Sequence, residues 1–93
     1  MIRSFADKQT AALFEGRISK GVPAALAPRA KRALDRIDAA RVITDLQTPP
    51  SHRLHLLQGD QAGRWSISVN RQYRITFEFH DGDAHAVRFE DYH

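Results

Sequence analysis

The chain ends in four side chains suited to acid–base and phosphate chemistry, Glu90, Asp91, Tyr92 and His93. A second histidine, His55, lies among leucines and arginines, and Arg74 precedes an alternating apolar stretch. Cleaving RNA without a metal needs a base for the 2′-hydroxyl, an acid for the leaving 5′-oxygen and a cation for the phosphorane. Histidine titrates near neutrality, and arginine offers a planar fork that matches phosphate oxygens. These residue types indicate acid–base cleavage of RNA as one candidate chemistry.

A simpler interpretation of the same residues stays open at this point. A terminal Asp-Tyr-His can be a strand end with one packed ring and exposed polar neighbours. The corresponding alternative function is a module that binds RNA or a partner protein without cutting it. Replacing Asp91 or His93 by alanine separates the two, because only an enzyme loses its reaction while the fold stays intact.

Metal and cysteine chemistry find little support in the sequence. The chain has no cysteine, which excludes disulfides and thiolate zinc sites and fits a reducing compartment. His52 and His55 are three residues apart, but on an extended chain that spacing points them to opposite faces. We expect no metal and no cofactor.

Positive charge is concentrated in the first part of the chain. Residues 1–53 hold ten Lys and Arg against five acids, whereas residues 54–93 hold four against six. Together with a net charge of +3, this favours an acidic partner such as nucleic acid, although a basic helix face can also be merely solvated. The candidate basic stripe is formed by Arg29, Lys31, Arg32 and Arg36.

The elements that would position these residues are helices first and strands second. Apolar spacing predicts a short helix over residues 7–15, with Gly16 as its cap, and a longer helix over residues 26–37. Pro28 either kinks this longer helix or marks its start. A short helical segment over residues 41–46 ends before the Pro49–Pro50 pair.

Alternating residues then predict an antiparallel meander, with strands over residues 54–57, 65–69, 73–79 and 84–90 and residues 1–5 as an edge strand. The predicted fold is α+β: two N-terminal helices and a short helical segment on one face of a mainly antiparallel sheet. We expect one domain over residues 1–93. The other sheet face, with Ser66, Arg74 and Thr76, should be an open polar trough for nucleic acid.

Several segments in order along nearly the whole chain resemble HigB toxins, which belong to the RelE superfamily of type II toxin–antitoxin systems. They are Met1–Phe5, Gly21–Pro23, Leu54–Asp60, Trp65–Val69, Tyr73–Ile75 and Glu90–His93. The resemblance implies a RelE-like microbial ribonuclease fold and an endoribonuclease that cuts mRNA in the A site of the small ribosomal subunit. It also implies a HigA-type helix-turn-helix antitoxin and, through it, binding to operator DNA.

The same resemblance implies roles for individual residues. The positions that match the family's catalytic residues are His55, Asp91, Tyr92 and His93. The resemblance does not say which of His55, Asp91 and His93 is the acid and which is the base. Arg74 falls on a phosphate contact, and Arg29, Arg32 and Arg36 would face ribosomal RNA. Many relatives have lysine where this chain has Gln58, so Arg53 and Arg64 are the candidates to supply that charge near the substrate.

The sequence also bears on location. The N-terminus lacks the apolar run of a signal peptide, and no stretch approaches the roughly 20 apolar residues of a membrane span. We therefore expect a soluble, cytoplasmic protein with no membrane contact.

Overall fold

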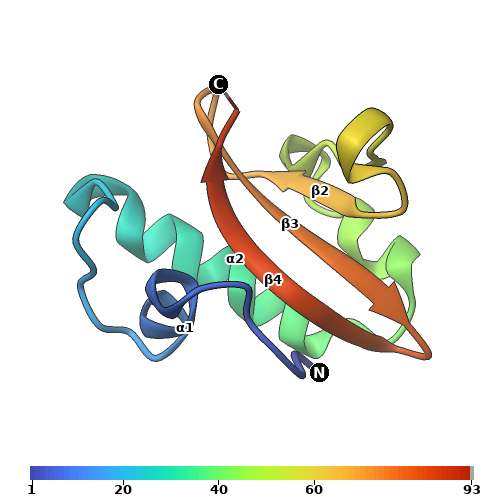
Figure 1. Cartoon of the computed structure of the whole chain (residues 1–93), viewed down its shortest axis with the longest axis horizontal. Helices are drawn as coiled ribbons and strands as arrows, with labels where there is room; N and C mark the ends of the chain where they lie inside the picture. Colours follow the sequence, from blue (N-terminus) through green and yellow to red (C-terminus); the bar gives the residue numbers. More distant parts are fainter. Residues whose placement is uncertain (93) are drawn as a thin grey trace.

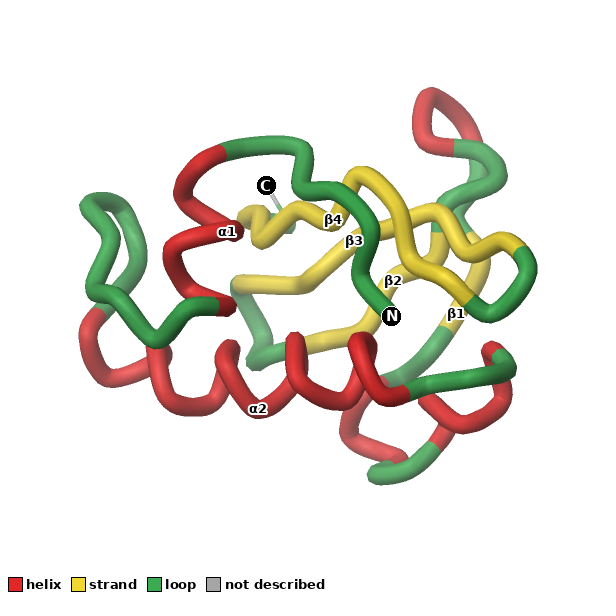
Figure 2. Tube along the Cα trace, turned by 90° about the horizontal axis from the view of Figure 1, so that it is seen from below, coloured by secondary structure: helices red, strands yellow, loops and turns green. Residues whose placement is uncertain are grey.

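The computed structural model describes residues 1–92, so His93 lies outside the described residues. Within them, the chain forms helices α1 and α2 and a four-stranded sheet, with short 3-10 turns between (Figure 1). The predicted α+β class is confirmed. Helix α2 runs beneath the sheet, and α1 lies beside it near the C-terminal end of the last strand (Figure 2).

Helix α1 spans Lys8–Phe14 and has clear signals at both ends. The Asp7 carboxylate accepts the Thr10 backbone N–H at 2.8 Å and so caps the first turn. At the other end Gly16 has φ 82°, and the N–H groups of Gly16 and Arg17 donate to the carbonyls of Leu13 and Ala12. This pattern is a Schellman motif, and it confirms Gly16 as the stop signal.

Helix α2 spans Ala27–Ala39, directly after the 3-10 turn η1 at Ala24–Leu26. Pro28 lies in the first turn, where a backbone N–H has no partner to lose, so it marks the start of the helix and does not kink it. The apolar face predicted for this helix is confirmed, since four of its side chains are buried in the core: Ala30, Ala33, Leu34 and Ile37. Two more 3-10 turns follow, η2 at Ile43–Gln47 and η3 at Pro50–His52.

The sheet is an antiparallel meander in the order β1-β2-β3-β4. Its strands are His55–Leu56, Trp65–Ser68, Tyr73–His80 and Asp83–Asp91. The first strand is shorter than the sequence predicts. The N-terminal segment runs parallel to β4 through isolated bridges from Ile2 to Ala84 and from Phe5 to Val87, so it extends the edge without becoming a regular strand.

A bulge in β4 decides which of its side chains reach the core. Between the pairs Thr76–Arg88 and Glu78–His85 the strand β4 gains one residue, and Ala86 takes φ 51° there. Because of this extra residue, Ala84 and Val87 are both buried although they are three positions apart. The core between sheet and helices also contains Ile67, Ile75 and Phe77, as the alternation predicts.

The other face of the sheet is not the open trough that the sequence suggests. Ser66 and Thr76 are 0% exposed, so the centre of this face is covered. The Arg64 guanidinium lies across it and donates to Thr76 Oγ1 at 3.1 Å and to the Ala86 carbonyl at 2.7 Å. The prediction of an open polar face was wrong because a long arginine side chain, coming from the residue before β2, can fold back over small polar neighbours.

Candidate active site

An open pocket of about 570 Å³ lies where the end of β4 meets the β2–β3 turn and η3. It brings together four of the residues singled out in the sequence: Arg29, Arg53, His55 and Tyr92. They come from α2, the end of η3, β1 and the segment after β4, so the fold assembles them from distant parts of the chain. The pocket therefore lies at one end of the sheet and not over its centre.

The backbone fixes the orientation of the His55 ring. Arg53 has φ 48° at the end of η3, and this left-handed turn places its carbonyl 2.8 Å from His55 Nδ1. A carbonyl only accepts, so Nδ1 carries the proton in the neutral ring and Nε2 keeps its lone pair. Among residues 1–92 no group hydrogen-bonds to Nε2, and the ring is exposed. Nε2 is the atom positioned to exchange a proton with a ligand.

Contacts on three sides hold Tyr92. Its hydroxyl lies 2.5 Å from Ser68 Oγ, and its backbone N–H donates to the Gln72 carbonyl at 2.8 Å. The Arg74 guanidinium carbon lies 5.1 Å from the ring centroid, in cation–π geometry. A ring fixed in this way can present a face to a nucleobase or its hydroxyl to a phosphate.

Arg74 contacts the Tyr92 ring but does not itself line the pocket. Its Nε is 3.0 Å from Glu90 Oε1, and the two side chains are only 16% and 11% exposed. Gln61 Nε2 also donates to this carboxylate oxygen, at 3.3 Å. In the structure Arg74 therefore contacts Glu90 and the Tyr92 ring. The sequence predicts that Arg74 contacts a phosphate.

Two other predicted residues, Arg64 and Asp91, do not join the pocket lining. Arg64 is occupied on the far sheet face by Thr76, the Ala86 carbonyl and an ion pair to Glu78 at 3.6 Å. Asp91 accepts from Gln72 Nε2 at 3.0 Å and lines a different surface pocket, next to Tyr73. His93 lies outside the described residues.

The pocket also contains residues that sequence reasoning missed: Ser51, Ser68, Asn70 and Arg71. Asn70 Oδ1 accepts the backbone N–H groups of Gln72 and Tyr73 at 2.9 and 2.7 Å, and this Asx turn leaves Arg71 exposed at its tip. The available signal was a basic residue inside a predicted tight turn. Its proximity to His55 depends on tertiary structure and has no local signature.

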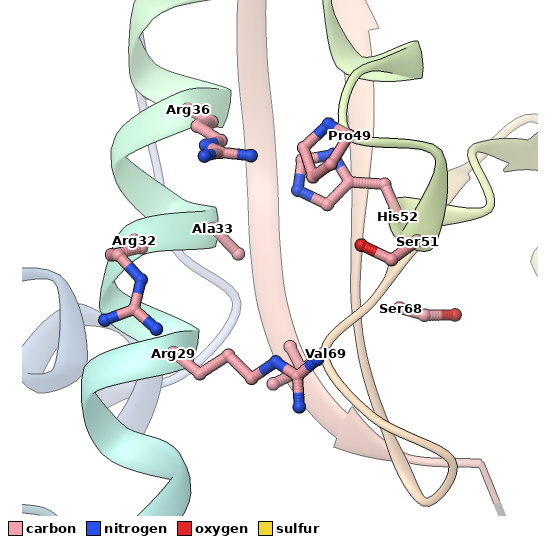
Figure 3. Close-up of a pocket in the computed structure, with 9 residues that line it drawn as sticks. All are labelled: Arg29, Arg32, Ala33, Arg36, Pro49, Ser51, His52, Ser68 and Val69. Carbon is pink, nitrogen blue, oxygen red and sulfur yellow. The ribbon is translucent and has the colours of Figure 1, made fainter.

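A second, smaller cavity of about 150 Å³ opens beside the first, between α2 and η3 (Figure 3). Its walls carry the arginines predicted for the basic stripe, Arg29, Arg32 and Arg36, opposite Ser51 and His52. Lys31 belongs to another part of the helix surface, where it pairs with Asp35 and lies 5.0 Å from the Phe14 ring centroid.

His52 is 5% exposed, and its Nδ1 lies 3.1 Å from the Leu46 carbonyl. Burial lowers the pKa of His52 below its ordinary value and outweighs this hydrogen bond, which acts in the opposite direction; the nearby Arg36 charge lowers it further. His52 is therefore neutral at physiological pH, and the positive charge of the cavity comes from the arginines.

Within residues 1–92, no three His, Asp or Glu side chains group together as metal ligands would. No helix in the same range has the length and apolar character needed to cross a membrane.

The chain is similar to known proteins over its full length. Residues 3–93 match the family model described as "RelE-like toxin of type II toxin-antitoxin system HigB". The chain is 44% identical to "Endoribonuclease HigB" of Proteus vulgaris over 93 residues, which cover 100% of both chains. It is 35% identical to "Toxin HigB-1" of Vibrio cholerae over 85 residues, or 90% of each chain.

A solved structure extends the comparison to three dimensions. The crystal structure of a YafQ mutant from E. coli superposes with a TM-score of 0.64 over 99% of this chain and 92% of that one, at 15% sequence identity. At this low identity the likeness concerns the fold alone. The fold and the family match define the class of protein as a RelE-like toxin of a type II toxin–antitoxin system. Within that class, the chain belongs to the HigB family, and membership implies an antitoxin partner.

Proposed function

We propose that this toxin is an endoribonuclease that cuts messenger RNA in the A site of the small ribosomal subunit and so inhibits translation. The observation that carries the proposal is the meeting of His55, Tyr92 and Arg53 at one open pocket, with His55 Nε2 unengaged among residues 1–92. The name of the Proteus vulgaris relative, which is 44% identical over the full length, supports the same activity.

The reaction would use the RNA's own 2′-hydroxyl as nucleophile. A base removes its proton, the oxygen attacks the adjacent phosphorus, and the bond to the 5′-oxygen breaks as an acid protonates that oxygen. The products are a 2′,3′-cyclic phosphate and a 5′-hydroxyl. His55 and the C-terminal Asp91 and His93 are the groups that we propose for the acid and base roles, and no metal is required.

The cations around the pocket would bind the phosphate and stabilise its developing charge. Arg29, Arg53 and Arg71 line the pocket and are exposed, so their guanidinium groups can reach a bound phosphodiester. Tyr92 would stack on a base or hydrogen-bond the phosphate. We assign Arg74 an indirect role, because its contacts to Glu90 and Tyr92 position the ring.

The finer partner assignments belong to the same proposal. We propose a HigA-type antitoxin with a helix-turn-helix fold, binding of the complex to operator DNA through that antitoxin, and action in the cytoplasm, where ribosomes are found. Family membership supports an antitoxin, and the basic surface of α2 supports contact with RNA.

Cleavage of a defined mRNA, in the presence and absence of ribosomes, tests the proposal. We expect the toxin to cut the message bound to programmed ribosomes and to leave the unbound message intact. Equal cleavage of both would reject ribosome dependence, and no cleavage of either would favour the alternative of a non-catalytic binding module. Toxin first treated with a chelator should keep its activity; loss restored by one divalent ion would reject the metal-free mechanism.

A further inference from the structure

The cavity between α2 and η3 is separate from the pocket around His55, yet the two share four lining residues: Arg29, Ser51, Ser68 and Val69. We propose that this second cavity binds a phosphodiester of the same RNA strand that enters the candidate active site, at a linkage next to the one that is cut. The inference rests on the proposed function and adds a second substrate subsite to it.

Uncompensated positive charge is the first argument. Arg29, Arg32 and Arg36 are exposed, and none of them forms an ion pair with another of residues 1–92. On the same helix, Lys31 is paired with Asp35. Three like charges on one wall repel each other, so a bound anion would relieve a repulsion that the fold leaves in place.

The arrangement of the arginines is the second argument. Figure 3 shows Arg29 and Arg36 extending from α2 toward the opposite wall, where Ser51 and His52 lie. Guanidinium groups on one side and a serine hydroxyl on the other are all donors suited to phosphate oxygens. Because His52 is neutral and its Nδ1 donates to the Leu46 carbonyl, it forms a wall of the cavity and adds no further cation.

Continuity with the first pocket identifies the anion as part of the substrate. Arg29 lines both spaces, and the arginine row runs from it along α2 for about 10 Å, given a rise of about 1.5 Å per residue. A single-stranded RNA bound across His55 would thus continue directly over Arg32 and Arg36. A ribosomal RNA helix would meet a convex surface more readily than a cavity of about 150 Å³.

Binding of a short, uncleavable 2′-O-methyl RNA to the whole toxin tests the inference by fluorescence anisotropy. The variant Arg32→Gln/Arg36→Gln should bind it about tenfold or more weakly than wild type, because charge-assisted hydrogen bonds to phosphate are lost. The matched control, Arg17→Gln/Lys20→Gln, removes the same charge from the exposed loop after α1 and should change affinity by less than about twofold. Thermal unfolding of all variants checks the fold.

Neutral methylphosphonate linkages, introduced one at a time, locate the contact. In wild type, one linkage beside the cleavage site should weaken binding when neutralised, and Arg32→Gln/Arg36→Gln should abolish that sensitivity. Binding that the double variant leaves unchanged would overturn the inference, and so would equal losses in the variant and its control. Weaker binding to ribosomes with unchanged binding to the oligonucleotide would assign the arginines to ribosomal RNA and also overturn it.

The binding measurement stays informative if the proposed function fails, because the oligonucleotide cannot be cleaved. A toxin that cuts no RNA but shows the predicted linkage-specific loss would keep the phosphate subsite and lose the enzyme assignment. A toxin that cuts ribosome-bound message with equal efficiency in wild type and in Arg32→Gln/Arg36→Gln, without a difference in binding, would keep the enzyme and lose the subsite.

Discussion

The guanidinium carbon of Arg74 lies 5.1 Å from the centroid of the Tyr92 ring, while its Nε is held 3.0 Å from Glu90 Oε1. Glu90, Arg74 and Tyr92 thus form a chain of contacts that ends at the pocket. In the proposed reaction Arg74 would act on the substrate through Tyr92, which would make it a positioning residue.

Arg74→Lys keeps the charge but loses the planar group that stacks on the ring and meets the carboxylate. We expect the cleavage rate to fall by about tenfold to a hundredfold, because a displaced ring no longer aligns the substrate. Glu90→Gln should have a similar effect on the rate through the same chain. The control Arg41→Lys, at an exposed position outside this chain of contacts, should cut at the wild-type rate. Wild-type cleavage by both Arg74→Lys and Glu90→Gln would contradict the positioning role.

The hydroxyl contact between Ser68 and Tyr92 gives a double-mutant prediction. Ser68→Ala and Tyr92→Phe each remove this 2.5 Å contact and should each slow cleavage by about tenfold, which corresponds to about 1.4 kcal/mol. If the hydroxyl works through its contact with Ser68, the double variant should be no slower than Tyr92→Phe alone. Rates that multiply in the double variant would show that the two side chains act independently.

His55→Ala should lower cleavage by about 10²-fold to 10⁴-fold, the usual contribution of a general acid or base. The side chain is exposed, so the free energy of unfolding should change by no more than about 0.5 kcal/mol. The matched control is His80→Ala, which should cleave at the wild-type rate. His80 lies at the β3–β4 turn, at the end of the hairpin opposite Tyr92. A fully active His55→Ala would remove this residue from the mechanism.

Burial of His52 makes stability depend on pH. Because the folded-state pKa lies below the ordinary value of 6.5, the unfolded chain binds a proton more readily than the folded one. The contribution of His52 to the free energy of unfolding is therefore fully present above about pH 6.5. It is lost as the pH falls toward the folded-state pKa. His52→Asn, which keeps a donor for the Leu46 carbonyl, should flatten this fall in urea unfolding measured at neutral and mildly acidic pH. An unchanged slope would show that another group titrates.

Thr10 connects α1 to β4, the strand that leads to Tyr92. It is 0% exposed, and its hydroxyl accepts the Phe89 N–H at 2.9 Å while donating to Asp7 Oδ1 at 2.6 Å. Thr10→Val keeps the shape but leaves that buried N–H without a partner, so it should lower the free energy of unfolding by about 1–3 kcal/mol. Thr44→Val, at an exposed position, is the control and should be nearly neutral.

Much of the fold could be predicted because its signals are local. Gly16 ends α1 through its left-handed backbone, Pro28 fits only the first turn of α2, and the alternation from Tyr73 to Phe79 assigns the faces of β3. The bulge at Ala86 could not be predicted, because the extra residue is defined only by pairing with β3. The coverage of Thr76 by Arg64 likewise depends on where a long, flexible side chain finds its partners.

The site was predicted in part for a similar reason. His55 and Tyr92 have chemistry that can be recognised from residue type, and the structure brings them to one pocket. Arg74 and Arg64 have the same chemistry as Arg53 and Arg71, and only their three-dimensional partners distinguish a structural arginine from an exposed one. Residue type indicates what a side chain can do, whereas its contacts decide whether it is available to a ligand.

The ends of the RNA fragments test the central claim most directly. Message cut on programmed ribosomes should be analysed by mass spectrometry, for wild type and for His55→Ala. Attack by the 2′-hydroxyl predicts a 2′,3′-cyclic phosphate, or the phosphate that forms when it opens, together with a 5′-hydroxyl, and the variant should yield little of either. Fragments with a 3′-hydroxyl and a 5′-phosphate would contradict the account, because attack by water from outside the strand would then make the cut.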